Sequence, residues 1–204
     1  AKEGGWGGLG TRANAEALPF TDNSVDLVID NENMADMTPV KLTRNELLTN
    51  KGETEQHQEA LDWIRRIRLP IEANPPDDVI FNLGPIRFVA ELWRVLKPGG
   101  HAFLTEFGVE EGWPASVKLP GHTEYEVQYS HLRQAVRWLG FQERYLSLPQ
   151  FLAMKPDTKV LCTGAAYTIQ RFCQAMNKPF TVRAYTYSAF GHRLGQAWCD
   201  EFLK

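Results

Sequence analysis

The sequence predicts an α/β protein with a doubly wound, mainly parallel sheet. Short runs of apolar and β-branched residues are typical of buried parallel strands, and amphipathic helical segments lie between them. In the middle of the chain a strand is followed by a helix, a glycine turn and another strand, which is the βαβ order of a parallel sheet. With 204 residues the chain is long enough for one sizeable core, so we expect a single domain over residues 1–204.

The first predicted strand runs from Ser24 to Asp30. Residues 1–11 carry five glycines and are expected to form a loop, because glycine resists regular structure. The run VDLVI that follows Ser24 is short and mostly apolar, as expected of a strand buried on both faces. Pro19 and the turn at residues 21–23 set its start.

A helical insertion is predicted between residues 38 and 84. Residues 41–50 and 60–68 have the pattern of two helical pieces around a polar turn at residues 51–58, and prolines at 70, 75 and 76 end the second piece. We expect this insertion to form a lid over the active-site end of the sheet, since a closing lid excludes water and orders a substrate.

Further helices and strands are predicted downstream. A helix over 88–96 should stop at the Lys-Pro-Gly-Gly turn and lead into a strand over 101–107. Ser130 is the expected N-cap of a helix that ends at Gly140. Beyond these, residues 165–176 fit a helix and residues 181–188 fit a strand.

The charge and the cysteine content limit the classes of partner that the protein is expected to bind. The net charge of −3 and the pI near 6.0 show no basic excess, so neither nucleic acid nor an anionic membrane is expected to bind. Small molecules and proteins are the expected partners. Three cysteines without CxxC spacing indicate a reducing, cytoplasmic setting, and no apolar run approaches the ~18 residues of a membrane span.

Two segments resemble class I S-adenosylmethionine-dependent methyltransferases. Residues 14–28, NAEALPFTDNSVDLV, are similar to the family's DAexLPFxDxSFDxV stretch, and residues 91–100, ELWRVLKPGG, are similar to its ExxRVLKPGG turn. The resemblance implies a Rossmann-like methyltransferase fold in which these segments follow the third strand, form the fourth and lead into the fifth. The N-terminal strands and the glycine-rich GxGxG loop are missing, so an upstream part of the same domain is expected.

The resemblance also assigns residues to the cofactor, S-adenosylmethionine. Asn14 and Ala15 match the positions that meet the adenine, although the family has Asp where this chain has Asn14. Asp30 and Asn31 lie where the fourth strand opens toward the sulfonium and the substrate, outside the carboxyl end of a strand where ligands of open α/β sheets bind.

A narrower resemblance rests on residues 31–36, 106–108 and 122–132. These segments are similar to the metal-dependent methylating domain of apratoxin-type polyketide synthase loading modules. The resemblance implies methylation of the acidic carbon of a malonyl group on an acyl carrier protein, helped by a mononuclear first-row metal such as iron or manganese. A metal that chelates two substrate oxygens would lower the barrier to deprotonation as a Lewis acid.

Candidate metal ligands and bases follow from these segments. His122, Gln128 and His131 are the expected metal ligands, because imidazole and amide groups suit an octahedral first-row metal. Four acidic residues are candidates for an oxygen ligand or a general base, and three of them form the predicted catalytic set. The acidic residues are Glu32, Asp36 and Glu106, which form that set, and Glu124.

Two alternatives to this enzyme remain open. A metal-free O- or N-methyltransferase acting on a small molecule would need the same cofactor segments without the metal ligands. A non-catalytic pseudo-methyltransferase, which serves as a scaffold, would account for a missing glycine loop. Fold resemblance alone does not choose between them.

Overall fold

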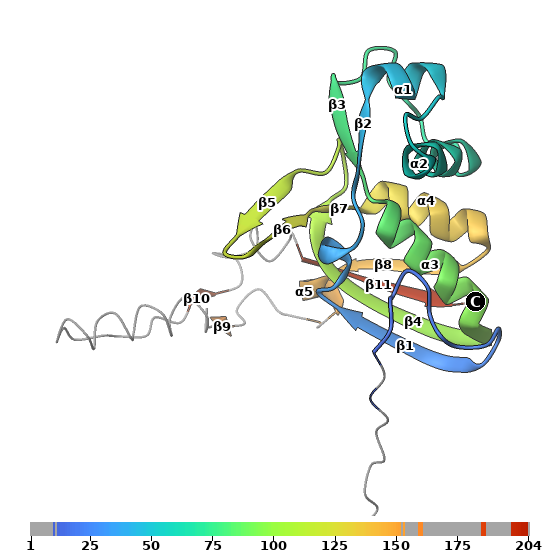
Figure 1. Ribbon diagram of the computed structural model, residues 1–204. Helices are drawn as coiled ribbons and strands as arrows, with labels where there is room; N and C mark the ends of the chain where they lie inside the picture. The colour runs from blue at the N-terminus through green and yellow to red at the C-terminus, as the bar shows by residue number, and fades with distance from the viewer. Residues whose placement is uncertain are drawn as a thin grey trace, which may run out of the picture.

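The computed structural model of the protein describes residues 10, 12–151, 153, 159–160, 185–186 and 197–203 (Figure 1). This part of the chain contains both helices and strands. Their bounds are β1 Val25–Asn31, the 3₁₀ helix η1 Met34–Asp36, β2 Val40–Thr43, α1 Arg44–Thr49, α2 Glu55–Arg66, β3 Asp78–Phe81, α3 Leu83–Val95, β4 Leu96–Val109, β5 Ser116–Leu119, β6 His122–Tyr125, β7 Val127–Gln128, α4 Tyr129–Leu139, β8 Gln142–Ser147, α5 Leu148–Phe151, β9 Lys159–Val160, β10 Tyr185–Thr186 and β11 Ala197–Leu203.

The main sheet is mixed rather than wholly parallel. Its strand order is β1-β4-β11-β8, and β7 pairs with the end of β4. β1 and β7 are both parallel to β4, with Asp30 opposite Leu104 and Gly108 opposite Val127. β11 is antiparallel to β4 on one side and to β8 on the other. The three parallel strands agree with the predicted fold class, whereas β11 was not predicted from the sequence.

The predicted strand at residues 24–30 is confirmed as β1, but its expected burial on both faces is wrong. Val28 and Asp30 are partly buried, whereas Leu27 and Ile29 are 50% and 72% exposed. Alternate residues of a strand point to opposite faces of the sheet, so one face of β1 is covered and the other is open.

α3 leads directly into β4. The helix begins at Leu83, five residues before the predicted start, after the N-cap Asn82. β4 begins at Leu96, so the Lys-Pro-Gly-Gly segment lies inside the strand instead of forming a separate turn. The pairing with β1 changes register there, and Gly99 has a positive φ of 79° that glycine adopts without strain.

The two segments that resemble methyltransferases contact each other. The carboxylate of Glu91 accepts a hydrogen bond from the backbone N–H of Leu18 at 2.8 Å and two from Arg94. Arg94 also donates to the carbonyl oxygens of Leu18 and Phe20 and to Asp22. The acidic and basic residues of the ExxR motif therefore hold the Leu-Pro-Phe segment that precedes β1.

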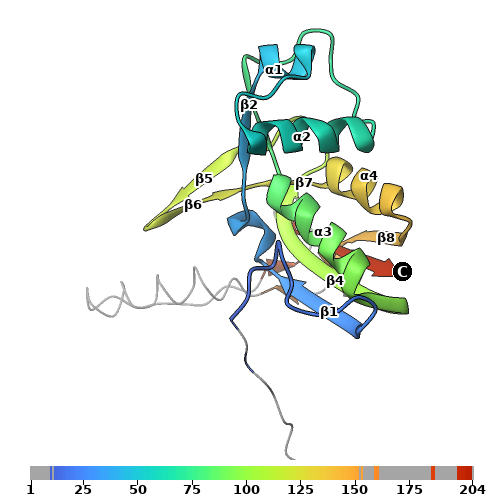
Figure 2. The ribbon, with the colours of Figure 1, turned by 45° about the vertical axis from the view of Figure 1, so that its right-hand side comes forward.

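The hydrophobic core lies between the sheet and two helices. α3 and α4 lie on the same side of β4 in both views (Figures 1 and 2). On the other side, Phe151 of α5 contacts Phe103 of β4. Fully or nearly fully buried side chains fill the space under the two helices; they include Val89, Leu92, Ala102, Leu104, Leu132 and Val136. Burial of these apolar side chains is the main force that holds the layers together.

The insertion at residues 38–84 contains more than the two predicted helical pieces. β2 and β3 form an antiparallel ribbon at its base, and α1 and α2 follow β2. α2 begins at Glu55, inside the segment predicted as a polar turn, because Thr54 caps its N-terminus by accepting a hydrogen bond from His57 N–H. The polar residues 55–58 form the first turn of this helix, with Glu55 and Gln56 exposed and His57 and Gln58 partly buried, which the composition alone did not reveal.

α2 of the insertion packs on the outside of α4, and α1 lies beyond α2 (Figures 1 and 2). Trp63 of α2 and Trp138 of α4 make an edge-to-face contact with ring centroids 5.7 Å apart. In both views α1 and α2 lie at the opposite end of the molecule from β1 (Figures 1 and 2). The part of the insertion that extends toward β7 is the ribbon of β2 and β3.

Several predictions concern residues outside the described part of the chain. The helix predicted at 165–176 lies wholly outside it, and of the strand predicted at 181–188 only Tyr185–Thr186 is described, as β10. Among the described helices, none is both long enough and apolar enough to cross a membrane.

Candidate functional site

Acidic side chains meet at the carboxyl ends of β1 and β4. Asp30 and Asn31 are the last two residues of β1, and they lie opposite Leu104 and Thr105 of β4. Glu106 is the next residue of β4. Because the two strands are parallel and adjacent, their carboxyl ends form one edge of the sheet, where ligands of α/β proteins bind.

Asp30 is partly buried, and one oxygen of its carboxylate has no hydrogen-bond partner among the described residues. Oδ1 accepts a hydrogen bond from Asn33 Nδ2 at 3.0 Å, whereas Oδ2 is buried without a hydrogen-bond partner in the described part of the chain. Burial raises the pKa of the Asp30 carboxyl, against the opposing effect of the Asn33 hydrogen bond. A buried oxygen without a partner is costly, so this atom is suited to receive a donor or a cation.

Glu106 is 3% exposed and held by backbone donors. Its Oε2 accepts from Ala35 N–H at 3.1 Å and its Oε1 accepts from Phe107 N–H at 2.8 Å. Burial raises the pKa of the Glu106 carboxyl; the two backbone hydrogen bonds lower it, and the charges of Glu32 and Asp30 raise it further. Glu106 therefore holds a proton more readily than an exposed glutamate.

Glu32 turns the chain from β1 into η1. Its φ of 51° lies in the left-handed region, which costs a non-glycine residue about 1 kcal/mol or more. Its backbone N–H still donates to Thr105 C=O at 2.8 Å, and Asn31 Oδ1 accepts from Thr105 Oγ1 at 2.6 Å. The strained turn thus keeps Glu32 beside β4, close enough for its charge to act on Glu106.

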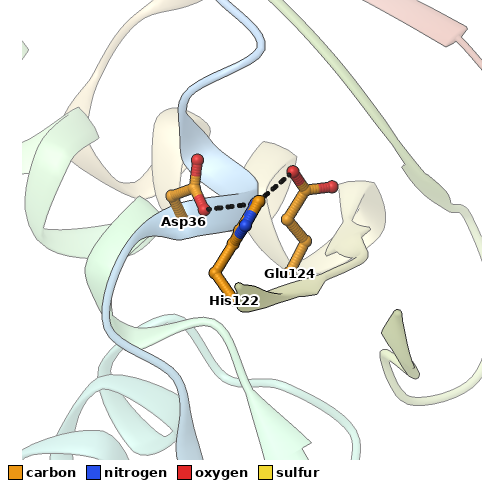
Figure 3. A group of neighbouring side chains, drawn as sticks. All are labelled: Asp36, His122 and Glu124. Carbon is orange, nitrogen blue, oxygen red and sulfur yellow. Dashed lines mark hydrogen bonds and ion pairs between the residues drawn. The ribbon is translucent and has the colours of Figure 1, made fainter. Parts of the chain in front are cut away.

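A second group of polar side chains contains His122. Its Nε2 lies 3.0 Å from Glu124 Oε1 and 3.7 Å from Asp36 Oδ1 (Figure 3). One ligand atom from each of the three residues lies within 4.8 Å of the other two, and no other such group of His, Cys, Asp or Glu occurs among the described residues. His122 and Glu124 come from β6, and Asp36 comes from η1.

η1 joins the two groups. Ala35 donates its backbone N–H to Glu106, and the next residue, Asp36, faces His122. Met34 and Ala35 are buried, so packing fixes η1 against the end of β4. Asp36, Glu106 and His122, which are far apart in the sequence, therefore belong to one region of the fold.

Gln128 and His131 lie outside the group formed by His122, Asp36 and Glu124. Gln128 is the N-cap of α4, the position predicted for Ser130, and its Oε1 accepts from the backbone N–H groups of Ser130 and His131. Its Nε2 donates to the carbonyl oxygens of Glu110 and Gly112. The amide of Gln128 is therefore fully engaged in holding α4 and the loop after β4.

His131 packs among aromatic side chains. Its ring contacts Trp113 edge-to-face at 5.2 Å and Phe81 at 6.2 Å between centroids. Its Nδ1 is buried without a hydrogen-bond partner in the described structure. Burial lowers the pKa of His131 from 6.5 to about 4, so the imidazole is neutral at physiological pH. The structure does not join His131 to the group of His122, Asp36 and Glu124.

Asn14 and Ala15 occupy a tight turn before β1. Asn14 Oδ1 accepts from Glu16 N–H at 2.9 Å, and the Asn14 carbonyl accepts from Ala17 N–H at 3.0 Å. The side chains of Asn and Asp both carry an Oδ1 atom that can accept this hydrogen bond. The turn therefore keeps its geometry with Asn14 in place of the Asp of the family pattern. Glu16 then accepts from Thr38 N–H at 2.9 Å, which places the turn beside the residues that follow η1.

Two asparagines, the buried Asn82 and the partly buried Asn33, support the site and were not singled out from the sequence. Asn33 binds Asp30, and Asn82 joins α3 to β7 by donating to Glu126 C=O and accepting from Gln128 N–H. The position of Asn82 just before a helix start with Pro85 in its first turn is a recognised start signal that could have found it. Asn33 carries no comparable signal, because its role depends on the turn at Glu32.

The sheet and its covering helices define a mixed α/β protein that is consistent with a Rossmann-like fold. Among solved structures, the chain is similar to the crystal structure of the [4+2]-cyclase SpnF at 16% identity and a TM-score of 0.39, with 95% of this chain and 54% of that chain covered. The chain thus spans about half of that protein, and the similarity is too slight to indicate a function. No protein-family profile matches the chain, and no curated protein matches it.

Proposed function

We propose that the chain is the C-terminal portion of an S-adenosylmethionine-dependent methyltransferase domain that methylates a small-molecule or carrier-bound acyl acceptor. The observation that carries the proposal is a pair of carboxyls near the carboxyl ends of adjacent parallel strands, the partly buried Asp30 and the buried Glu106, whose pKa values burial raises. The hydrogen-bonded contact between the two methyltransferase-like segments supports it, because it gives both segments a shared physical role.

The residues at this edge fit a positively charged cofactor. When bound, S-adenosylmethionine supplies a methyl group on a sulfonium cation. The free Oδ2 of Asp30 is the buried oxygen that a cation or a donor would satisfy, and Asn31 lies next to it. Asn14 and Ala15 would contact the adenine from the turn before β1.

Acid and base roles follow from burial. A carboxylate whose pKa is raised is a stronger base than an exposed one, so it is better suited to accept a proton from an acceptor. Burial raises the pKa of Glu106, which lies near the carboxyl end of β4. Glu32 would act on Glu106 through its charge, and Asp36 would act at the neighbouring group that contains His122.

We also propose that the site holds a first-row metal ion. Asp36, His122 and Glu124 offer one nitrogen and two carboxylate oxygens, a donor set that suits iron or manganese. These residues would hold the metal beside η1 and leave positions open for substrate oxygens. A Lewis acid there would help an acceptor carbon, such as that of a malonyl group, to lose its proton. His122 keeps its predicted role in this proposal, whereas Asp36 and Glu124 take the places first predicted for Gln128 and His131.

An upstream strand of the same domain is the proposed partner of β1. Among the described strands β1 pairs only with β4, and a groove of about 810 Å³ runs along its residues from Ser24 to Ile29. The edge of β1 that faces away from β4 has no partner among the described strands, and such an edge invites a further strand. A longer chain should protect the β1 amides from hydrogen exchange, and equal exchange in both chains would contradict this pairing.

The cofactor is tested by calorimetric titration of S-adenosylmethionine into the 204-residue chain. We expect saturable binding that Asp30→Asn weakens and that the matched control Asp26→Asn leaves unchanged. Asp26 is an exposed residue of the same strand that pairs with Lys97. A folded wild-type chain that gives no saturable heat would contradict the proposal for this chain and favour a scaffold.

The metal is tested separately by titrating Mn²⁺ and following the free ion by electron paramagnetic resonance. His122→Ala should abolish specific binding, whereas Glu111→Gln, which removes an exposed acid outside the group, should not. Cofactor binding without metal binding would leave a metal-free methyltransferase as the function.

A further inference from the structure

Arg87 of α3 lies between two carboxylates from different parts of the chain. Its Nε and Nη2 donate to the two carboxylate oxygens of Glu59 at 2.9 and 2.5 Å. Its Nη1 donates to Glu16 Oε2 at 3.0 Å. Glu59 is in the middle of α2, in the insertion, and Glu16 follows Asn14 and Ala15 in the turn before β1.

Glu16 is itself fixed by its surroundings. Its side chain is 9% exposed, and its Oε1 accepts from Thr38 N–H, the first residue of the insertion. Gly84, at the start of α3, makes room for this contact: a Cβ there would lie 2.4 Å from Thr38 N and 2.8 Å from Glu16 Oε1. The turn, the insertion and α3 therefore meet within hydrogen-bond distance.

The two carboxylates depend on Arg87 for neutralisation. Hydrogen bonds from Arg87 hold the pKa of Glu59 below its ordinary value, while the charge of Glu16 acts to raise it. Burial acts to raise the pKa of Glu16, but hydrogen bonds from Thr38 and Arg87 hold it below its ordinary value. Both acids are thus ionised, and the charge of Glu16 acts on Glu59. Without the guanidinium, two like charges would remain at one junction.

We infer that Arg87 is a positioning residue that locks the α2 insertion to the turn carrying Asn14 and Ala15 by neutralising Glu59 and Glu16 together. The planar fork of arginine can hold one carboxylate with two N–H groups and still donate to a second, which a lysine ammonium does not reproduce. An effect of Arg87 on binding of S-adenosylmethionine rests on the proposed function. The coupling between the insertion and the turn does not depend on it.

The coupling is tested by amide hydrogen exchange at residues 14–18 and 55–66. Arg87→Ala should raise exchange in both segments by about 5- to 30-fold, as expected when charged hydrogen bonds at a partly buried junction are lost. Adding Glu59→Gln to Arg87→Ala should then lower exchange again in both segments, because it removes the repulsion of Glu16. In the wild-type background, Glu59→Gln should instead raise exchange in α2.

Asp62→Asn is the matched control, since Asp62 lies on α2 three residues beyond Glu59 but bonds only Gln58 and Arg65 within its own helix. It should give no protection to residues 14–18 in the Arg87→Ala background. The inference is overturned if Arg87→Ala raises hydrogen exchange in α2 but not at residues 14–18. It is also overturned if, in the Arg87→Ala background, Glu59→Gln protects residues 14–18 no better than Asp62→Asn does. Should Arg87→Ala fail to fold, Arg87→Gln, which also removes the charge but keeps a longer side chain, replaces it with the same signs expected.

A titration of S-adenosylmethionine separates this inference from the proposed function. If the wild-type chain binds, Arg87→Ala should weaken binding several-fold, and the added Glu59→Gln should restore part of the loss. If the wild-type chain does not bind, the proposed function fails while the exchange results still decide the coupling.

Discussion

His131 is expected to remain neutral well below the pH at which histidine normally takes up a proton. Its ring packs against Trp113 and Phe81, and its Nδ1 is buried without a partner in the described structure. Protonation would place a charge in this apolar setting, so burial lowers the pKa of His131 from 6.5 to about 4. In the unfolded chain the same imidazole is hydrated and titrates near 6.5.

The direction and size of the effect on stability follow from linkage. Between pH 6.5 and about 4 the unfolded state binds a proton at His131 that the folded state does not, so stability is lost as the pH falls through this window. The free energy of unfolding should fall by about 2 kcal/mol from pH 7 to pH 5 on account of this residue alone. Over the whole window the loss is roughly 3 kcal/mol.

The assay compares urea unfolding of the wild-type chain and His131→Phe at pH 7 and pH 5. Phenylalanine keeps an aromatic ring beside Trp113 and cannot take up a proton, so the variant should lack this part of the pH dependence. The difference between the two proteins should therefore shift by about 2 kcal/mol in favour of the variant at pH 5.

The ring proton resonances of His131 give an independent measurement. An NMR titration should place the midpoint near 4, as burial requires. A midpoint close to 6.5, or the same pH dependence of unfolding in both proteins, would refute the burial of His131.

Three further results are expected. Glu91→Ala should lower the free energy of unfolding by about 1 to 3 kcal/mol, because Leu18 N–H loses a charged acceptor; an unchanged urea midpoint would count against the contact. Gly84→Ala should cost about 1 to 3 kcal/mol by overpacking against Thr38, measured in the same way, and full stability would show that the backbones do not approach so closely. Burial raises the pKa of Glu106, so the contribution of this residue to stability should decline as the pH rises above 4.5. In urea unfolding between pH 4 and 7, the stability of the wild type relative to Glu106→Gln should therefore fall as the pH rises, and a constant difference would contradict the assignment.

The sequence by itself determined those helices and strands that depend on a few neighbouring residues. The β-branched run after Ser24 formed β1, and α4 ended at Gly140, whose φ of 102° suits glycine alone. That Asp30 and Glu106 lie near the carboxyl ends of their strands also followed from the sequence, because the apolar runs that predict the two strands end close to these residues.

Contacts between distant segments were decided only by the tertiary structure. Nothing in the sequence places Asp36 beside His122, since the two meet only when η1 packs against β4 and β6 folds back. The separation of His131 from that group likewise depends on the aromatic cluster around it. Side-chain spacing along one helix or strand is set by local geometry, whereas ligand sets and pKa shifts depend on burial and on charges brought from elsewhere in the chain.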